Sequence, residues 1–146
     1  MEIAALITWL VTAVGGIVML GIWISRGGNR PPRSSKFPPG LIFGHFALAA
    51  IGLVLWIIYV AADNEALAWT AFVVLLPVAL LGFGMLARWL PTYRSSAVVA
   101  AADTAGSAPG VPAERHFPVA VVAGHGLFAV TTVVLVLLTA LGVGGS

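Results

Sequence analysis

Two histidines are the residues whose type and position could carry chemistry. His45 and His125 lie 80 residues apart, each directly after a glycine and inside a long apolar stretch. No Asp, Glu, Lys or Arg interrupts either stretch, so these imidazoles are the only ionisable side chains within them. An ionisable group in hydrocarbon is costly and is by default a functional candidate. Because neutral imidazole is a common metal ligand, a metal or haem site is the first chemistry to consider.

The two histidines belong to matching segments. The chain reads FPPGLIFGHFALAAIGLVLWIIYV from Phe37 and FPVAVVAGHGLFAVTTVVLVLLTA from Phe117. Both segments open with Phe-Pro and place Gly-His at the same distance from it, a pairing that is not ordinary membrane composition. A weaker match at a shift of 62 aligns Thr8 with Thr70 and Arg26 with Arg88. We therefore expect a duplicated two-helix unit whose histidine helices run parallel, with both imidazoles about 12 Å from Phe-Pro.

Small residues follow each histidine on its helix face. Four and seven residues after the histidines stand Ala49 and Gly52 in one segment, and Ala129 and Thr132 in the other. Two such stripes facing each other leave an apolar slot in which a b-type haem could lie, with the two histidines as axial ligands. Cations for haem propionates stand before the same segments, at Arg33, Lys36, Arg115 and His116.

A structural role for the histidines stays open beside haem binding. In that alternative each imidazole donates a hydrogen bond to a carbonyl or a threonine of a neighbouring helix. The threonines that could serve as partners are Thr8, Thr12, Thr70, Thr131 and Thr132. Met19 and Met85 are interpreted as packing residues rather than as a copper path.

The histidine segments belong to a chain with little charge. Its 146 residues are 60% apolar and 8% charged, with 17 glycines and no cysteine. Soluble domains carry about a quarter charged residues. Uncharged runs long enough to cross a bilayer cover residues 3–24, 41–62, 66–87 and 119–141. We expect an all-α integral membrane protein, a four-helix bundle built from two parallel two-helix repeats and forming one domain over residues 1–146.

The connections between the runs indicate an orientation. All seven basic residues lie after the first run or between the third and fourth, whereas the other side carries Glu2, Asp63 and Glu65. The positive-inside rule therefore places both basic connections in the cytoplasm and both termini outside the bacterial plasma membrane. Residues 95–113 predict a flexible linker, and Pro77 predicts a kink. Aromatic residues near the run ends are typical of interfacial belts: Trp23, Trp56, Tyr59, Trp69, Trp89 and Tyr93.

Several function classes are excluded by composition and motif. The net charge of only +2 argues against nucleic acid as a partner. No carboxylate lies in a run to relay protons, and no phosphate-binding, zinc-protease or nucleophile-elbow motif occurs. We expect no stand-alone catalytic activity. The expected partners are the lipid bilayer and a second copy of the chain or a larger respiratory membrane complex.

The layout of short helices with histidines on a facing pair resembles small membrane b-type cytochromes, including four-helix b561-like proteins and anchor subunits of respiratory dehydrogenases. This resemblance implies electron transfer or haem sensing, with haem b held by His45 and His125. Members that hold two haems need four histidine ligands, whereas this chain offers one pair. The alanine-rich style and the phrase AERHFP also resemble small four-helix membrane proteins of high-GC actinobacteria, which implies a lineage and no activity. The alternative function is a non-catalytic accessory or assembly subunit of a larger membrane complex.

Overall fold

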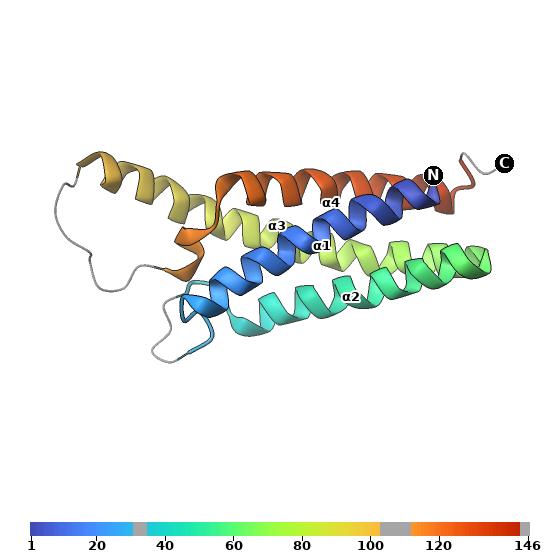
Figure 1. Ribbon diagram of the computed structural model, residues 1–146, viewed down its shortest axis with the longest axis horizontal. Helices are drawn as coiled ribbons and strands as arrows, with labels where there is room; N and C mark the ends of the chain where they lie inside the picture. The colour runs from blue at the N-terminus through green and yellow to red at the C-terminus, as the bar shows by residue number, and fades with distance from the viewer. Residues whose placement is uncertain (31–34, 103–111, 144–146) are drawn as a thin grey trace.

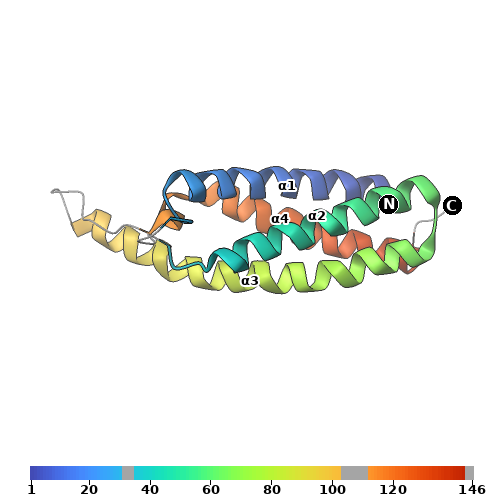
Figure 2. The ribbon, with the colours of Figure 1, turned by 90° about the horizontal axis from the view of Figure 1, so that it is seen from below.

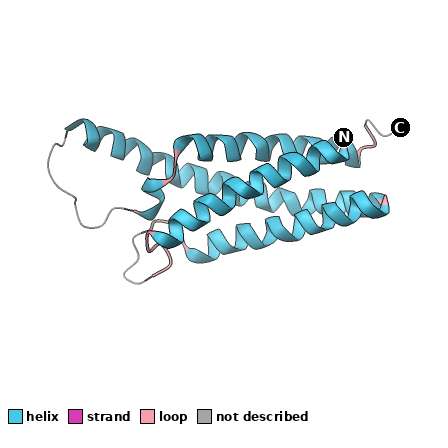
Figure 3. Ribbon diagram, viewed as in Figure 1, coloured by secondary structure: helices cyan, strands magenta, loops and turns pink. Residues whose placement is uncertain are grey.

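The structure, a computed structural model, describes residues 1–30, 35–102 and 112–143, and every regular element in these ranges is helical (Figures 1 and 3). The elements are α1 (Glu2–Ser25), α2 (Pro39–Ala62), α3 (Glu65–Ala102), the short 3₁₀ helix η1 (Ala113–His116) and α4 (Val119–Ala140). All four α-helices are long and apolar enough to cross a membrane. The all-α four-helix bundle expected from the sequence is confirmed.

The helices pack as two close pairs. α1 packs along α4, α2 packs along α3, and the two pairs meet through α3 with α4 and α1 with α2. α2 and α4 are diagonal across the bundle, as are α1 and α3 (Figures 1 and 2). One end holds the start of α1, the α2–α3 turn and the end of α4, and we name it the terminal end (Figure 1). The opposite end, with η1 and the α1–α2 connection, is named the loop end.

Proline and short polar side chains define where the helices begin. α2 starts after Pro38 and α4 after Pro118, each in the extended conformation that the residue before a helix requires. The α2–α3 turn is short because Asp63 takes a left-handed conformation at φ 48°. Asn64 then accepts a hydrogen bond from the Ala66 backbone N–H at 3.0 Å and caps α3.

α3 runs further than the sequence analysis indicates. The helix continues through Ala102, so residues 95–102 are helical rather than part of a linker. The segment SSAVVAAA lacks an apolar face, but alanine has the highest helix propensity and needs no buried face to stay helical. The remainder of the expected linker, residues 103–111, lies outside the described residues. The other helix bounds agree with expectation to within two residues.

Apolar side chains cover the outside of the bundle. Leu80 is 73% exposed, Leu127 is 67% exposed and Val14 is 62% exposed. In each of the four apolar helical windows, only 11–17% of the residues are buried inside the protein. A soluble bundle instead places charged residues opposite its apolar stripe, so this surface has the character of one that faces hydrocarbon.

Four of the six aromatic residues assigned to interfacial belts are buried instead. Trp23 and Trp56 are 0% exposed, Trp89 is 6% exposed and Tyr59 is 8% exposed. The three indoles donate to protein acceptors: Trp23 to the Ser35 hydroxyl, Trp56 to the Glu2 carbonyl and Trp89 to the Glu114 carbonyl. The belt interpretation fails for these residues because a tryptophan near a helix end can satisfy its N–H inside the protein as well as at a headgroup. Trp69 and Tyr93 are exposed.

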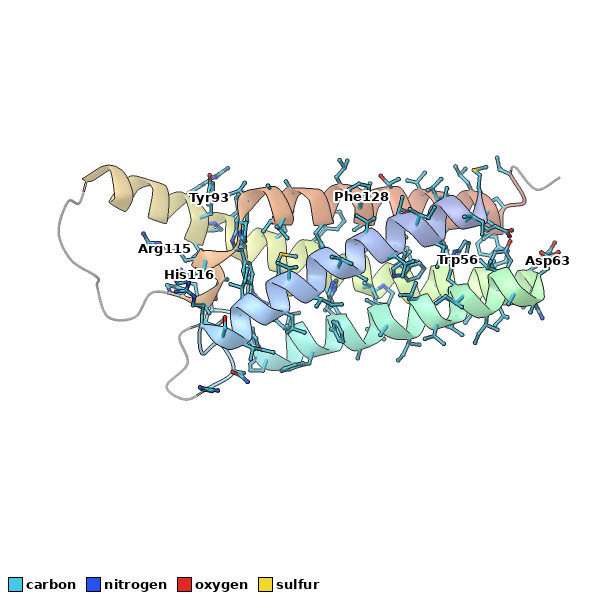
Figure 4. The ribbon with its side chains drawn as sticks, in the orientation of Figure 1. Trp56, Asp63, Tyr93, Arg115, His116 and Phe128 are labelled. Atoms are coloured by element: carbon cyan, nitrogen blue, oxygen red, sulfur yellow. The ribbon has the colours of Figure 1, made fainter. Side chains whose placement is uncertain are left out.

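The terminal half of the bundle is closed by an aromatic core. Trp9 of α1 and Trp56 of α2 have ring centroids 6.5 Å apart, and Tyr59 lies 4.7 Å from Trp56 (Figure 4 labels Trp56). The Trp9 ring covers Gly52, where an added Cβ would lie 3.0 Å from the ring. A side chain at this position has no room unless Trp9 moves.

This contact generates a stability prediction. Gly52→Leu should lower the free energy of unfolding in detergent by about 2 kcal/mol, because it overpacks the buried Trp9 ring. Gly84→Leu is the matched control, since a Cβ at Gly84 meets nothing within 4 Å. Denaturant unfolding followed by circular dichroism measures both variants, and equal losses would contradict the role given to Trp9.

Candidate histidine site

His45 and His125 meet inside the bundle from diagonal helices, each six residues after the start of its helix at the loop end. Their ring centroids lie 6.4 Å apart, with 56° between the ring planes. The sequence predicts that both histidines lie at one depth on parallel helices, and α2 and α4 do run in the same direction (Figure 1). Both histidines are partly buried.

One nitrogen of each ring is held by a neighbouring helix. His45 Nδ1 donates to the Val78 carbonyl of α3 at 3.0 Å, and His125 Nδ1 donates to the Thr12 carbonyl of α1 at 2.9 Å. A carbonyl oxygen only accepts, so the proton of each neutral ring is on Nδ1 and Nε2 keeps its lone pair. In the described part of the chain, neither Nε2 has a hydrogen-bond partner. This is the tautomer in which histidine binds a metal through Nε2.

Glycines on the neighbouring helices make room for the rings. A Cβ added at Gly82 of α3 would lie 3.3 Å from Cε1 of His45. At Gly16 of α1 the same distance to Cε1 of His125 is 3.3 Å, and at Gly15 an added Cβ lies 3.4 Å from Cβ of His125. The rings reach the helix carbonyls because no side chain separates them from the backbone.

The contacts that α1 and α3 make with the histidines show how the two helix sequences align with each other. Thr12 and Val78 are 66 residues apart, as are Gly16 and Gly82. At this offset the sequence GIVMLGIW beginning at Gly16 aligns with GFGMLARW beginning at Gly82, and both fit the pattern GxxMLxxW. A shift of 66 residues therefore places residues of α1 and α3 with equivalent histidine contacts opposite each other. The weaker sequence match at a shift of 62 does not.

The small residues expected beside the histidines divide into two sets. Gly52 is covered by Trp9. The Thr132 hydroxyl lies 2.7 Å from the Phe128 carbonyl and 3.0 Å from the Thr8 hydroxyl, and its one proton is donated to either of these oxygens. These two positions are occupied by protein packing on the terminal side of the histidines. Ala49 and Ala129 are partly buried. Any ligand of the histidines has to lie at their level or towards the loop end.

Open space also lies beside the histidines along the chain. A Cβ added at Gly44 or Gly124, the residues directly before them, would meet no atom within 4 Å. These glycines hold equivalent positions in the two segments, and on a helix each points about 100° away from the histidine that follows it.

The cations expected near propionates lie at the loop end. Lys36 and His116 are exposed and Arg115 is partly buried; Figure 4 shows Arg115 and His116 at this end. Arg33 lies outside the described residues. His116 Nδ1 donates to the Ala113 carbonyl of its own turn at 3.3 Å, which satisfies it locally.

Glu114 is a buried residue that the sequence analysis does not single out. Its side chain is 0% exposed, and one carboxylate oxygen accepts the Lys36 backbone N–H at 2.8 Å. Its backbone carbonyl accepts the Trp89 indole N–H at 3.1 Å. Glu114 thus joins the segment before α2, the end of α3 and the segment before α4. The phrase AERHFP contains this residue, but nothing in its spacing signals burial.

The donor set fits a haem better than a bare metal ion. Within the described residues, no group of three or more His, Asp or Glu side chains could hold a metal. Two imidazoles are too few for a protein zinc site, whereas a porphyrin supplies four further nitrogens.

The hydrogen bonds predict a tautomer that can be observed. Nitrogen-15 spectra of histidine-labelled protein should place the proton of His45 and His125 on Nδ1. Gly82→Ala should shift the His45 signals and leave His125 unchanged, because the added Cβ displaces only the ring that it contacts. Gly84→Ala, which introduces the same methyl group into open space, should change neither. Nε2 protonation in the parent protein would contradict the assignment.

Comparison of the chain with models of known protein families, with curated proteins and with solved structures finds no match. A function for the chain therefore has to be argued from its own residues. The histidine pair and its hydrogen bonds are the most specific of these.

Proposed function

We propose that the four helices span the bacterial plasma membrane, with the loop end in the cytoplasm and both termini outside. The support is the apolar outer surface together with the charge on the connections. Basic residues flank the loop end, whereas Glu2, Asp63 and Glu65 flank the terminal end. Cytoplasmic connections carry the excess of Lys and Arg in membrane proteins.

We further propose that the bundle consists of two parallel two-helix repeats, α1–α2 and α3–α4. The support is the pair of offsets, 80 residues between the histidine helices and 66 between their glycine-bearing neighbours. The 14-residue difference between these offsets falls between α3 and α4, where the second repeat has the longer connection. Parallel repeats of this kind are related by an axis along the membrane normal.

The function that the geometry supports best is binding of one b-type haem between α2 and α4, for electron transfer or haem sensing. His45 and His125 are the proposed axial ligands. The observation that carries this proposal is that neither Nε2 has a partner among the described residues while the two ring centroids lie 6.4 Å apart. When bound, haem would supply a reversible one-electron couple.

The protein groups have separate tasks in this proposal. The Val78 and Thr12 carbonyls fix each imidazole in the Nδ1–H tautomer, which orients Nε2 and makes the ring more basic. Trp9 and Thr132 close the terminal side and exclude water from that half of the bundle. Lys36 would provide positive charge at the loop end for propionates.

A second candidate function rests on the same hydrogen bonds. Interhelical bonds from histidine to a carbonyl contribute about 0.6–2 kcal/mol each in membrane bundles, which is sufficient reason for their presence. The protein would then be a non-catalytic accessory or assembly subunit of a larger membrane complex, or a homo-oligomer. The two candidates differ in whether Nε2 has a ligand.

The proposed orientation predicts a labelling pattern. The chain has no cysteine, so single cysteines can be introduced at the exposed residues Asn64, in the α2–α3 turn, and Asn29, in the α1–α2 connection. A membrane-impermeant maleimide should label Asn64→Cys in intact cells and Asn29→Cys only after permeabilisation. The reverse pattern would contradict the orientation.

The haem proposal predicts an absorption spectrum. Protein expressed with ample haem and purified in detergent should show a Soret band at one haem per chain. His45→Leu and His125→Leu should each remove the six-coordinate spectrum and most of the bound pigment, because each removes one axial ligand. His116→Leu is the matched control and should retain the spectrum.

Two outcomes would separate the candidate functions. A parent protein without a Soret band, or a band that survives loss of both histidines, contradicts haem binding. If the double leucine variant then still co-purifies with the same membrane proteins as the parent, the accessory function is supported.

A further inference from the structure

An apolar groove runs between α3 and α4 on the outside of the bundle. It has a volume of about 400 Å³ and is lined by Phe83, Leu86 and Trp89 of α3 and by Val119, Gly126 and Val130 of α4, among others. α3 packs less extensively on α4 than on α2, so the groove marks where the two close pairs separate. It lies outside the histidine site, although His125 is on the same helix.

The groove walls favour a hydrocarbon ligand over one that hydrogen-bonds. Trp89 contributes the only polar side-chain group among the lining residues, and its indole N–H is already donated to the Glu114 carbonyl at 3.1 Å. A quinone ring or a peptide would find no side-chain donor for its carbonyl groups in this wall. A saturated or unsaturated chain needs none.

The length of the groove matches one leaflet of a bilayer. On α4 its lining extends from Val119 to Val130, which is about 16 Å at 1.5 Å per residue. Half of a hydrocarbon core is about 15 Å. Val119 is the first residue of α4, so the groove runs from the loop end to the middle of the helix, as one acyl chain of the leaflet at the loop end would.

Positive charge surrounds the open end of the groove. Tyr93 stacks on Trp89 with ring centroids 5.1 Å apart, and Arg94 follows it at the exposed surface of α3. Arg115 lies in η1, just before α4, and Figure 4 shows it with Tyr93 at the loop end. The neighbouring acid, Glu114, is fully buried. A headgroup at this point would therefore meet two guanidinium groups.

We propose that this groove binds one acyl chain of an anionic phospholipid and that Arg94 and Arg115 bind its headgroup phosphate. The inference rests on the proposed insertion of the bundle into a bilayer and not on haem binding. Basic pockets between membrane helices recognise anionic headgroups. The two arginines favour an anionic headgroup by charge complementarity, and the apolar wall of the groove favours an acyl chain.

The test uses the full-length protein in detergent, with native mass spectrometry to count bound lipid. Dioleoyl phosphatidylglycerol should bind more tightly than dioleoyl phosphatidylcholine by about 25-fold, which corresponds to about fivefold for each of the two cations. Arg94→Gln with Arg115→Gln should abolish this preference. Arg30→Gln with Arg88→Gln removes the same charge and should leave the preference unchanged, since Arg88 is about 200° around α3 from Leu86.

A second pair of variants tests the position of the chain. Gly126→Leu should weaken binding of both lipids about tenfold or more, because an added Cβ at Gly126 meets no atom within 4 Å and the side chain would fill the groove. Gly21→Leu on α1, also in open space, is the control and should bind like the parent. Full binding by Gly126→Leu would overturn the groove as the site.

Other results would also overturn the proposal. These are equal affinity for the two lipids, or a loss of preference in the Arg30→Gln, Arg88→Gln control as large as in the Arg94→Gln, Arg115→Gln variant. Tighter binding of an isoprenoid quinone or of a second copy of the chain to the same groove would identify a different occupant. Because lipid binding is counted without reference to pigment, its failure is distinguishable from absence of a Soret band. Failure of membrane insertion is detected separately, by the maleimide labelling.

Discussion

The structure depends on how an imidazole is accommodated in a bundle that offers few polar partners. Each histidine satisfies Nδ1 on a backbone carbonyl of the adjacent helix, at 3.0 Å for His45 and 2.9 Å for His125. A helix carbonyl already accepts one bond from its own helix but has a second lone pair. A ring can reach it only where the neighbouring backbone is bare, and Gly82 and Gly16 provide that access. The histidines therefore require the glycines, and together they require close packing of α2 on α3 and of α4 on α1.

The hydrogen bonds from Nδ1 also hold both imidazole rings at one level of the bundle. Fixing the proton on Nδ1 leaves each Nε2 as the reactive atom, and the crossing of the two helix pairs brings both rings to a centroid distance of 6.4 Å. On the terminal side, Trp9 over Gly52 and Thr132 bonded to Thr8 fill the centre with protein. Open positions remain beside the histidines at Gly44 and Gly124. Among the described residues, His45 and His125 are the pair of imidazoles that meet inside the bundle.

The sequence predicts the helices and the histidine pair because both leave local signals. Uncharged runs mark the spans, and the repeated Phe-Pro and Gly-His place His45 and His125 on parallel helices at the same depth. The sequence does not indicate the partners of the histidines. Thr12 and Val78 contribute backbone carbonyls, and every residue has one, so the residue type gives no signal. The GxxMLxxW pattern at Gly16 and Gly82 is present in the sequence, but its meaning emerges only when both glycines are seen under imidazole rings.

The differences between the sequence-based expectations and the structure also have specific causes. Position near a run end does not distinguish a tryptophan at a headgroup from one that donates inward, so Trp23 and Trp89 were assigned to the interface although both are buried. The alanine-rich segment 95–102 has no apolar face, yet it is helical by propensity. Glu114 looks like one more charge in a polar connection, and its burial follows from a tertiary contact with the Lys36 backbone. The tryptophans and Glu114 are decided by contacts between segments distant in sequence.

These contacts close into a ring around the bundle. Every adjacent pair of helices is joined by at least one aromatic N–H: Trp23 to Ser35 before α2, His45 to Val78 in α3, Trp89 to Glu114 before α4, and His125 to Thr12 in α1. In the proposed repeats, the indoles join helices within a repeat and the imidazoles join one repeat to the other. Each indole bonds to the segment that precedes a histidine helix, so the buried contacts of the loop end tie the starts of α2 and α4 to α1 and α3.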